Sequence, residues 1–239
     1  MALAQQLAEL RPYLDRMTEA EQQEVARGVL PAVIQQCAED GRFFLTFVTT
    51  IDEADPTAPT KPFPKHDYLL QLWDTLATSQ RVVVAKSRQM LVSWAVAAFC
   101  VWTARSKPHQ AIFWQSQQHD DAMAMVALPS GPVEGRCQFL ENHLDPWLRQ
   151  PIKTSEGFIQ YPNGSFIRAV AGGADKVRGK VFSIYVGDEF AYQEDQDGVL
   201  TTILPLIQKG ARAILVSTPN GSNNAFATIY HGRPVNVAG

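Results

Sequence analysis

The chain has 239 residues, of which 46% are hydrophobic and 19% charged, with 15 glycines and 15 prolines. This composition excludes disordered, collagen-like and disulfide-dense proteins. No run reaches the roughly 18 uninterrupted apolar residues that a membrane span needs, and the first residues lack the basic and then apolar pattern of a signal peptide. We therefore expect a soluble intracellular protein.

The net charge of −3 is unevenly distributed. Residues 1–60 carry ten acidic and four basic side chains, whereas residues 61–239 carry 14 acidic and 17 basic ones. Six of these bases face only two acids between Arg149 and Lys180. Such a basic segment permits contact with a polyanion, and a solvated surface explains it about as well. Binding of DNA through it would be weak and steeply salt-dependent.

Residues 1–60 are predicted to form a helical N-terminal arm. Thr18 and Glu21 have the spacing of a capping box, in which each side chain accepts a hydrogen bond from the backbone of the other. Apolar residues then follow at helical spacing. They are Val25, Val29, Leu30, Val33 and Ile34. A stiff connector rich in proline comes next and is expected to separate the arm from a core over residues 61–239. Its prolines are Pro56, Pro59, Pro62 and Pro64.

Short apolar runs alternate with helix-like stretches in the core. The runs are rich in β-branched and aromatic residues, as in strands buried on both faces of a parallel sheet, and span residues 81–85, 110–114, 183–187 and 212–216. The helix-like stretches cover residues 93–104, 117–128 and 196–208. Residues 158–161 and 165–168, joined through Pro162-Asn163-Gly164, predict a hairpin. The pattern predicts a layered α/β fold with a mostly parallel central sheet flanked by helices.

The residues after the first strand, Lys86 to Ser93, run directly into an apolar helix. In this context backbone N–H groups and the positive end of the helix bind phosphate. The stretch does not fit the regular phosphate-binding pattern G-x-x-x-x-G-K-[ST], because only the final hydroxyl, Ser93, is retained. A lysine at the start of the loop can reach the same phosphates, with Arg88 as a second cation. The alternative is a solvated basic turn before a core helix.

Polar residues follow two other predicted strands. Asp188 and Glu189 end the third strand, where one carboxylate can hold a metal ion and the other can polarise water; a helix cap is the alternative. Ser217-Thr-Pro-Asn-Gly221 follows the fourth strand and is either a turn or a sensor of a terminal phosphate. Arg178, ten residues before Asp188, is either a surface arginine or one that enters a neighbouring active site.

These motifs, in this order and spacing, resemble the N-terminal ATPase domain of the large terminase subunit of tailed bacteriophages. The resemblance rests on Lys86-Ser-Arg-Gln-Met, on Arg178-Gly-Lys ahead of Asp188-Glu189, and on Ser217-Thr-Pro-Asn-Gly. It implies a P-loop NTPase fold of the additional-strand, catalytic-glutamate type that binds ATP and Mg²⁺. It also implies a motor that drives double-stranded viral DNA into a procapsid. The partners would be the portal protein, the small terminase subunit and further copies in a ring, with a monomer in isolation. The location would be the host bacterial cytoplasm and, transiently, the procapsid.

The resemblance also assigns roles to individual residues. Ser93 and Asp188 would hold Mg²⁺, Glu189 would activate water, and Arg178 would be an arginine finger acting in trans. Arg88 would bind phosphate and assist catalysis. The remaining roles concern nucleotide binding by the loop (Lys86, Ser87, Arg88, Gln89, Met90, Leu91, Val92, Ser93), contact with adenine (Tyr68, Gln71) and coupling of hydrolysis to movement (Ser217, Thr218, Asn220).

Two departures from the family pattern matter. Leu91 stands where related loops usually keep a glycine, so its side chain is expected to crowd the phosphates. The nuclease domain of the family is absent from residues 1–239, so DNA cleavage is not expected from this chain. Two alternatives stay open: a non-hydrolysing module that docks on portal, small subunit or DNA, and a helicase-like ATPase.

Overall fold

The computed structural model describes residues 11–22, 24, 31–51, 57, 59–130 and 133–232. Its centre is a seven-stranded sheet in the order β3-β9-β8-β4-β7-β6-β5. The strands are β3 (Arg81–Ala85), β4 (Ala111–Gln115), β5 (Lys153–Ser155), β6 (Phe158–Gln160), β7 (Phe166–Val170), β8 (Ile184–Gly187) and β9 (Arg212–Ser217).

Five neighbouring strands of this sheet, β3, β9, β8, β4 and β7, run parallel. β6 and β5 continue the sheet in antiparallel pairing. The predicted parallel sheet and the predicted hairpin between β6 and β7 are therefore confirmed. β9 lies between β3 and β8.

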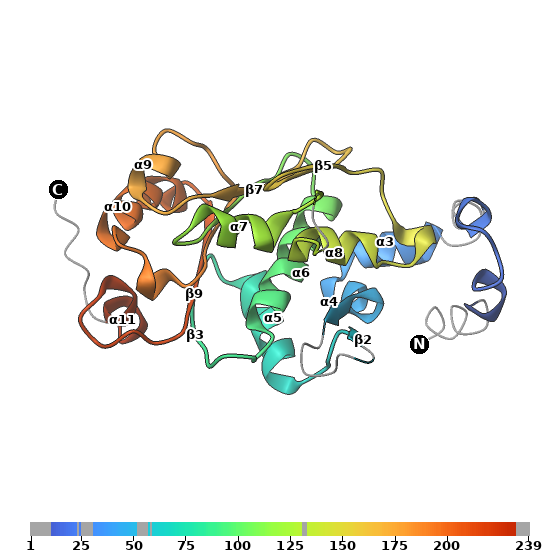
Figure 1. Cartoon of the computed structure of the whole chain (residues 1–239), viewed down its shortest axis with the longest axis horizontal. Helices are drawn as coiled ribbons and strands as arrows, with labels where there is room; N and C mark the ends of the chain where they lie inside the picture. Colours follow the sequence, from blue (N-terminus) through green and yellow to red (C-terminus); the bar gives the residue numbers. More distant parts are fainter. Residues whose placement is uncertain are drawn as a thin grey trace.

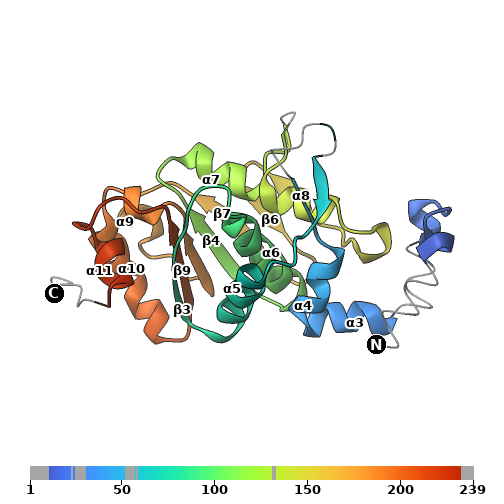
Figure 2. The same cartoon turned by 90° about the horizontal axis from the view of Figure 1, so that it is seen from below.

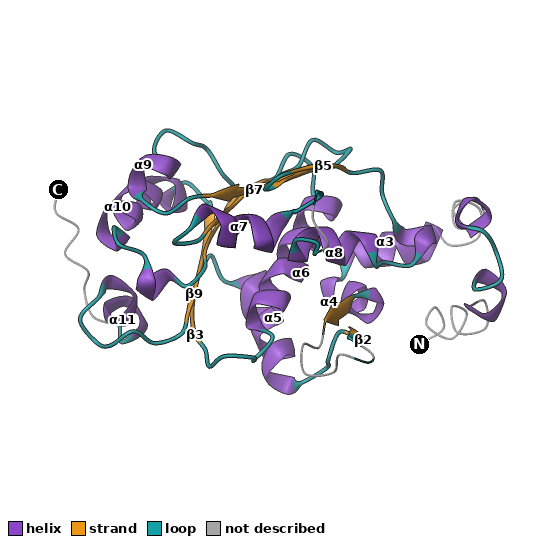
Figure 3. Ribbon diagram, in the orientation of Figure 1, coloured by secondary structure: helices purple, strands orange, loops and turns teal. Residues whose placement is uncertain are grey.

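Helices cover both faces of the sheet (Figures 1 and 3). One face carries α3 (Pro31–Glu39), α4 (Gly41–Phe44), α5 (Asp67–Thr78), α6 (Val92–Ser106), α7 (His119–Val126) and α8 (Arg136–Asn142). The other carries α9 (Ala174–Val177), α10 (Gln196–Gln208) and α11 (Ala225–Tyr230). Three single 3₁₀ turns also occur: η1 (Leu45–Phe47), η2 (Pro146–Leu148) and η3 (Phe190–Tyr192).

Alternation along the strands separates two hydrophobic clusters. In β4, Ile112 and Trp114 belong to the cluster under α3–α8, whereas Phe113 belongs to the cluster under α9–α11. α6 lies against the sheet between α5 and α8 (Figure 2). Thirteen of its 15 residues are buried, as expected for a helix that is apolar all round.

The N-terminal prediction is confirmed in part. Thr18 and Glu21 form the capping box: the Thr18 N–H donates to Glu21 Oε2 at 2.8 Å, and the Glu21 N–H donates to Thr18 Oγ1 at 3.4 Å. The prediction of helix throughout residues 1–60 is wrong at Thr49–Ile51, which forms strand β1 and pairs antiparallel with β2 (Thr60–Pro62). β-branched side chains at all three positions favour the extended conformation. Val25, Val29, Leu30 and Pro56 lie outside the described residues.

Helices α3 and α4 share the hydrophobic cluster of the core. Val33, Cys37 and Phe44 are buried in the same cluster as Trp73 and Trp102, and Trp102 Nε1 donates to the Cys37 carbonyl at 2.9 Å. A boundary between two units at residue 60 stays a prediction.

The three cysteines are buried free thiols. Separately, no helix in the described ranges combines the length and apolar character that crossing a lipid bilayer requires.

Candidate functional site

The loop between β3 and α6 holds an unusual backbone conformation. Gln89 and Leu91 have positive φ, at 60° and 54°. Leu91 is the N-cap residue of α6 and contributes no side-chain hydrogen bond to the first turn. The early N–H groups of a 15-residue helix are thus left without a side-chain acceptor, and the positive end of the helix dipole favours an anion there. The local geometry suits a phosphate group.

Lys86 connects this loop to the acidic pair at the end of β8. Its backbone N–H donates to the Ser217 carbonyl at 3.0 Å, which ties the start of the loop to the end of β9. Its ammonium Nζ lies 2.7 Å from Glu189 Oε1, and only 11% of the Lys86 side chain is exposed. The structure therefore brings the predicted cation and the predicted water-activating acid into direct contact.

Glu189 is held by a local turn and by the segment after β9. Its φ of 42° turns the chain sharply after β8, and its N–H donates to Asp188 Oδ1 at 3.1 Å. Its other carboxylate oxygen, Oε2, accepts from the Thr218 N–H at 2.9 Å and from Thr218 Oγ1 at 3.0 Å. Ser217 Oγ lies 3.3 Å from the same oxygen. Asn220 Nδ2 donates to the Ala191 carbonyl at 3.0 Å. The proposed coupling residues thus contact Glu189 or the turn after it.

The two neighbouring carboxyl groups have pKa values shifted in opposite directions. Burial raises the pKa of Asp188, which is 5% exposed, and the charge of Glu189 raises it further, against the opposing effects of Lys86 and Arg136. Burial also opposes ionisation of Glu189, but the hydrogen bonds from Lys86 and Thr218 outweigh it, so the pKa of Glu189 is lowered. Glu189 is therefore ionised at neutral pH, as a proton acceptor must be.

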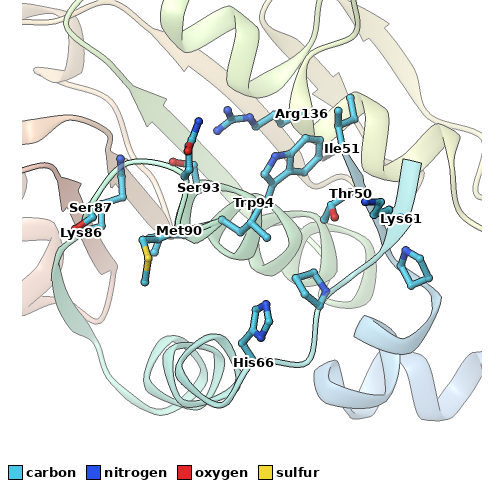
Figure 4. A pocket seen from close by; sticks show the side chains of 15 residues that line it. Thr50, Ile51, Lys61, His66, Lys86, Ser87, Met90, Ser93, Trp94 and Arg136 are labelled. Carbon is cyan, nitrogen blue, oxygen red and sulfur yellow. The ribbon is translucent and has the colours of Figure 1, made fainter. Parts of the chain in front are cut away.

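A cavity of about 450 Å³ opens beside the loop (Figure 4). Residues predicted to bind nucleotide supply much of its lining: Lys86, Ser87, Gln89, Met90, Leu91, Val92 and Ser93. The rest comes from Trp94, from α8 through Arg136, and from the N-terminal segments through Thr50, Ile51, Lys61, Pro62, Pro64 and His66. A space of this size, with cations on several sides, can hold a small polyanionic ligand.

Nine predicted residues lie outside the cavity lining. Five of them lie at the ends of β8 and β9, as described above: Asp188, Glu189, Ser217, Thr218 and Asn220. The other four lie elsewhere. Arg88 is exposed in the loop. Tyr68 stacks on His66 and donates from its hydroxyl to the Met90 carbonyl at 3.3 Å, so it contacts the loop itself. Gln71 is exposed on α5. Arg178 follows α9, is 70% exposed and pairs with Asp175 at 3.0 Å.

The predicted metal ligands are one hydroxyl and one carboxylate. Ser93 lies in the first turn of α6, and the Asp188 carboxylate lies at the end of β8. In the part of the chain that the structure describes, no three His, Cys, Asp or Glu residues form a group that could hold a metal ion. Mg²⁺ takes oxygen ligands and often has only one or two from the protein, with phosphates and waters completing its shell. The donor set therefore fits a Mg²⁺ that arrives with a phosphate ligand.

Sequence reasoning missed Arg136, Trp94, Lys61 and His66 as cavity residues. His66 lies between the prolines of the connector and the first predicted strand, and this position was the only sign that it could line a nucleotide site. Arg136 begins a seven-residue helix that the periodicity does not reveal.

Comparisons with known proteins show which class this fold belongs to. No family model matches the chain. The ATPase domain of the large terminase of Thermus phage P74-26 superposes with a TM-score of 0.53 at 19% identity, covering 69% of this chain and 68% of that one. The large terminase of bacteriophage HK97 gives 0.56 at 13% identity, with coverage of 80% and 40%. The large terminase of a thermophilic bacteriophage, in complex with ADP, gives 0.53 at 10% identity, with coverage of 70% and 42%.

The chain therefore has the P-loop-type α/β fold of phage large-terminase ATPase domains, and the predicted resemblance is confirmed at the level of fold. A curated relative, the Mu-like prophage FluMu protein gp28 of Haemophilus influenzae, is 30% identical over 159 residues. The match covers 62% of this chain and 30% of gp28, so the chain spans less than a third of that relative.

Proposed function

We propose that this chain is the ATP-hydrolysing motor domain of a phage DNA-packaging terminase. The observation that carries the proposal is the 2.7 Å contact between Lys86 Nζ and Glu189 Oε1, made beside a loop shaped for phosphate. Two residues 103 positions apart in sequence meet at the carboxyl edge of the sheet, where α/β proteins bind their ligands.

The proposed reaction is attack of water on the terminal phosphorus of ATP. The water oxygen forms the new P–O bond, the bond from that phosphorus to the bridging oxygen of ADP breaks, and the Glu189 carboxylate accepts the proton of the water. Lys86, with the N–H groups of the loop and of the first turn of α6, binds the phosphates. Ser93 and Asp188 would hold Mg²⁺, which supplies charge neutralisation on the phosphate oxygens when bound.

In this scheme the ammonium of Lys86 changes partner, from Glu189 to a phosphate. The same ammonium that pairs with Glu189 is the candidate phosphate ligand. Transfer of Lys86 to a phosphate leaves Glu189 held by Ser217 and Thr218 alone, with one carboxylate oxygen available to water. The segment after β9 would then sense hydrolysis through its hydrogen bonds to Glu189.

The assembly around the domain belongs to the same proposal. Copies would form a ring on the procapsid in the host cytoplasm, together with portal protein and small terminase subunit, and would translocate double-stranded DNA. Arg178 is exposed on the turn after α9, which supports the proposal that it acts on a neighbouring copy.

Release of phosphate from ATP and Mg²⁺ tests the proposal. Glu189→Gln should abolish turnover while leaving the fold intact, because the amide retains the shape of the side chain and cannot accept the proton. The matched control is Glu194→Gln, five residues further on and exposed, which should retain the wild-type rate. Equal turnover by wild type and Glu189→Gln would refute the assignment of the base.

A docking module that does not hydrolyse ATP is the second candidate. The observation in its favour is that Leu91 lines the cavity at the place where related loops usually keep a glycine. Calorimetric titration with a non-hydrolysable ATP analogue and Mg²⁺ separates the candidates: no binding at millimolar nucleotide favours docking.

A further inference from the structure

Arg136, the first residue of α8, brings a cation into the cavity from outside the phosphate loop. It lines the same space as Lys86 and Ser93 and is half-buried. Figure 4 shows Arg136 and Ser93 on one side of the cavity, with His66 on the other. Arg136 thus lies on the side of Ser93 rather than on the side of His66.

The surrounding packing fixes the position of this side chain. Its guanidinium lies over the ring of Trp94, 5.3 Å from the ring centroid, and Nη1 donates to Met125 Sδ at 3.4 Å. Trp94 is itself packed edge-on against Phe139, one turn further along α8. Gly135, the residue before Arg136, allows close packing, since a Cβ there would lie 2.5 Å from the Ala127 backbone. The start of α8 is therefore held against the end of α7.

Among the residues that the structure describes, no acidic side chain lies within ion-pair distance of Arg136. Within the described ranges it forms no ion pair, and the nearby Glu134 faces His143 instead, at 3.6 Å. The charge of Arg136 does act on the buried carboxylate of Asp188. A partly buried cation without a close partner costs stability unless an anion reaches it. The arrangement is the one expected of a residue whose partner is a ligand.

We propose that Arg136 is a nucleotide-binding residue that contacts the terminal phosphate of a nucleoside triphosphate from the α8 side of the cavity. Lys86 and the loop would contact the same phosphates from the α6 side. Arginine suits this role because its planar guanidinium makes two parallel hydrogen bonds to phosphate oxygens. The inference rests on the proposed function, and its test is chosen so that the two can fail separately.

Binding of ATP, ADP and tripolyphosphate to the whole chain, measured by calorimetry with Mg²⁺ and again with EDTA, tests the inference. Arg136→Met removes the charge and retains an unbranched apolar side chain against Trp94. It should weaken ATP and tripolyphosphate binding about 10- to 100-fold and ADP binding less than threefold, with or without Mg²⁺. Arg136→Lys should recover part of the loss. The control is Arg168→Met, which likewise removes a guanidinium from an aromatic ring, that of Phe158, away from the cavity lining.

These titrations distinguish failure of the Arg136 assignment from failure of the proposed function. Unchanged ATP affinity in Arg136→Met, with normal binding by wild type, would overturn the inference and leave the proposed function standing. A loss confined to the titrations with Mg²⁺ would also overturn it, because Arg136 would then act through Asp188 and the metal. Wild-type binding of tripolyphosphate but not of ATP, lost in Arg136→Met, would support the phosphate contact and refute the nucleotide assignment. Wild-type binding of neither would refute both.

Discussion

Backbone strain at the level of single residues is concentrated at the candidate site. Four non-glycine residues in the described part of the chain have positive φ, and three of them, Gln89, Leu91 and Glu189, lie in the loop or at the acidic pair. Such conformations cost free energy and persist where the surrounding structure enforces them, which is common at functional sites. The φ of 54° at Leu91 is one that glycine adopts without steric cost, so glycine would suit this position better than leucine.

Alanine variants are usually more stable than glycine variants, and at Leu91 we expect the reverse. Leu91→Ala loses packing and keeps the strained backbone, whereas Leu91→Gly loses slightly more packing and relieves strain of about 1 to 2 kcal/mol. We expect Leu91→Gly to be the more stable of the two by about 1 kcal/mol in urea unfolding. Gln89→Gly, at an exposed position with φ of 60°, is the control and should not be less stable than wild type. A less stable Leu91→Gly would mean that the left-handed conformation is not held in solution.

At the level of elements, a buried ion pair joins α6 to α8. Arg105 Nη1 lies 2.8 Å from Glu141 Oε2, with the side chains 5% and 2% exposed, and Arg105 also donates to the Leu148 carbonyl. Burial raises the pKa of Glu141 despite the nearby positive charge of Arg105. The pair fixes α8, which carries Arg136, against α6, which follows the candidate phosphate-binding loop.

Removal of one partner should be strongly destabilising. Glu141→Ala leaves Arg105 buried without its counter-charge and should cost about 3 to 5 kcal/mol in urea unfolding, whereas the double variant Arg105→Met/Glu141→Leu should cost much less. Because the folded state binds the Glu141 proton more tightly than the unfolded state, this group's contribution to stability falls as the pH rises from its ordinary pKa to the raised value. Glu141→Gln should therefore gain stability relative to wild type over that range. A loss under 1 kcal/mol in Glu141→Ala would show that the pair does not join the helices.

Helices and strands that are deeply buried could be predicted from the sequence, whereas exposed or very short ones could not. β3, β4, β8 and β9 were predictable because strands buried on both faces appear as continuous apolar runs, and α10 was predicted with the observed bounds. β5 has three exposed residues and no apolar pattern, and α8 is only seven residues long. The meeting of Lys86 with the acidic pair was predictable from parallel strands. The place of Arg136 was not, because it depends on how α7 and α8 pack.

At the level of the whole molecule, parallel strands bring distant segments to one edge. The residues after β3, β8 and β9 meet there because β9 lies between the other two strands. Arg178 is not among the residues that line the cavity. Its side chain is 70% exposed and pairs with Asp175, so in the proposed function it acts on a second copy of the chain.

Arg178→Ala should reduce the ATPase activity that depends on assembly without changing the stability of the fold. The Arg178–Asp175 pair is exposed, so its loss should leave the melting temperature nearly unchanged. An arginine supplied by a neighbour is worth about 10³-fold or more in rate for analogous enzymes, so ATPase activity that rises with protein concentration should lose that rise in the variant. Lys176→Ala, in the same exposed segment, is the control. Concentration-dependent turnover that survives Arg178→Ala would contradict the trans role.

In the proposed function one ammonium, that of Lys86, serves both Glu189 and a phosphate. A double-mutant cycle on the affinity for a non-hydrolysable ATP analogue tests this dual role. Glu189→Gln should bind the analogue more tightly than wild type, by roughly two- to fivefold, because Lys86 is released from a half-exposed ion pair. Lys86→Ala should bind it more weakly, and the gain from Glu189→Gln should be absent in that background. The same gain in both backgrounds, or wild-type affinity in Lys86→Ala, would contradict the account.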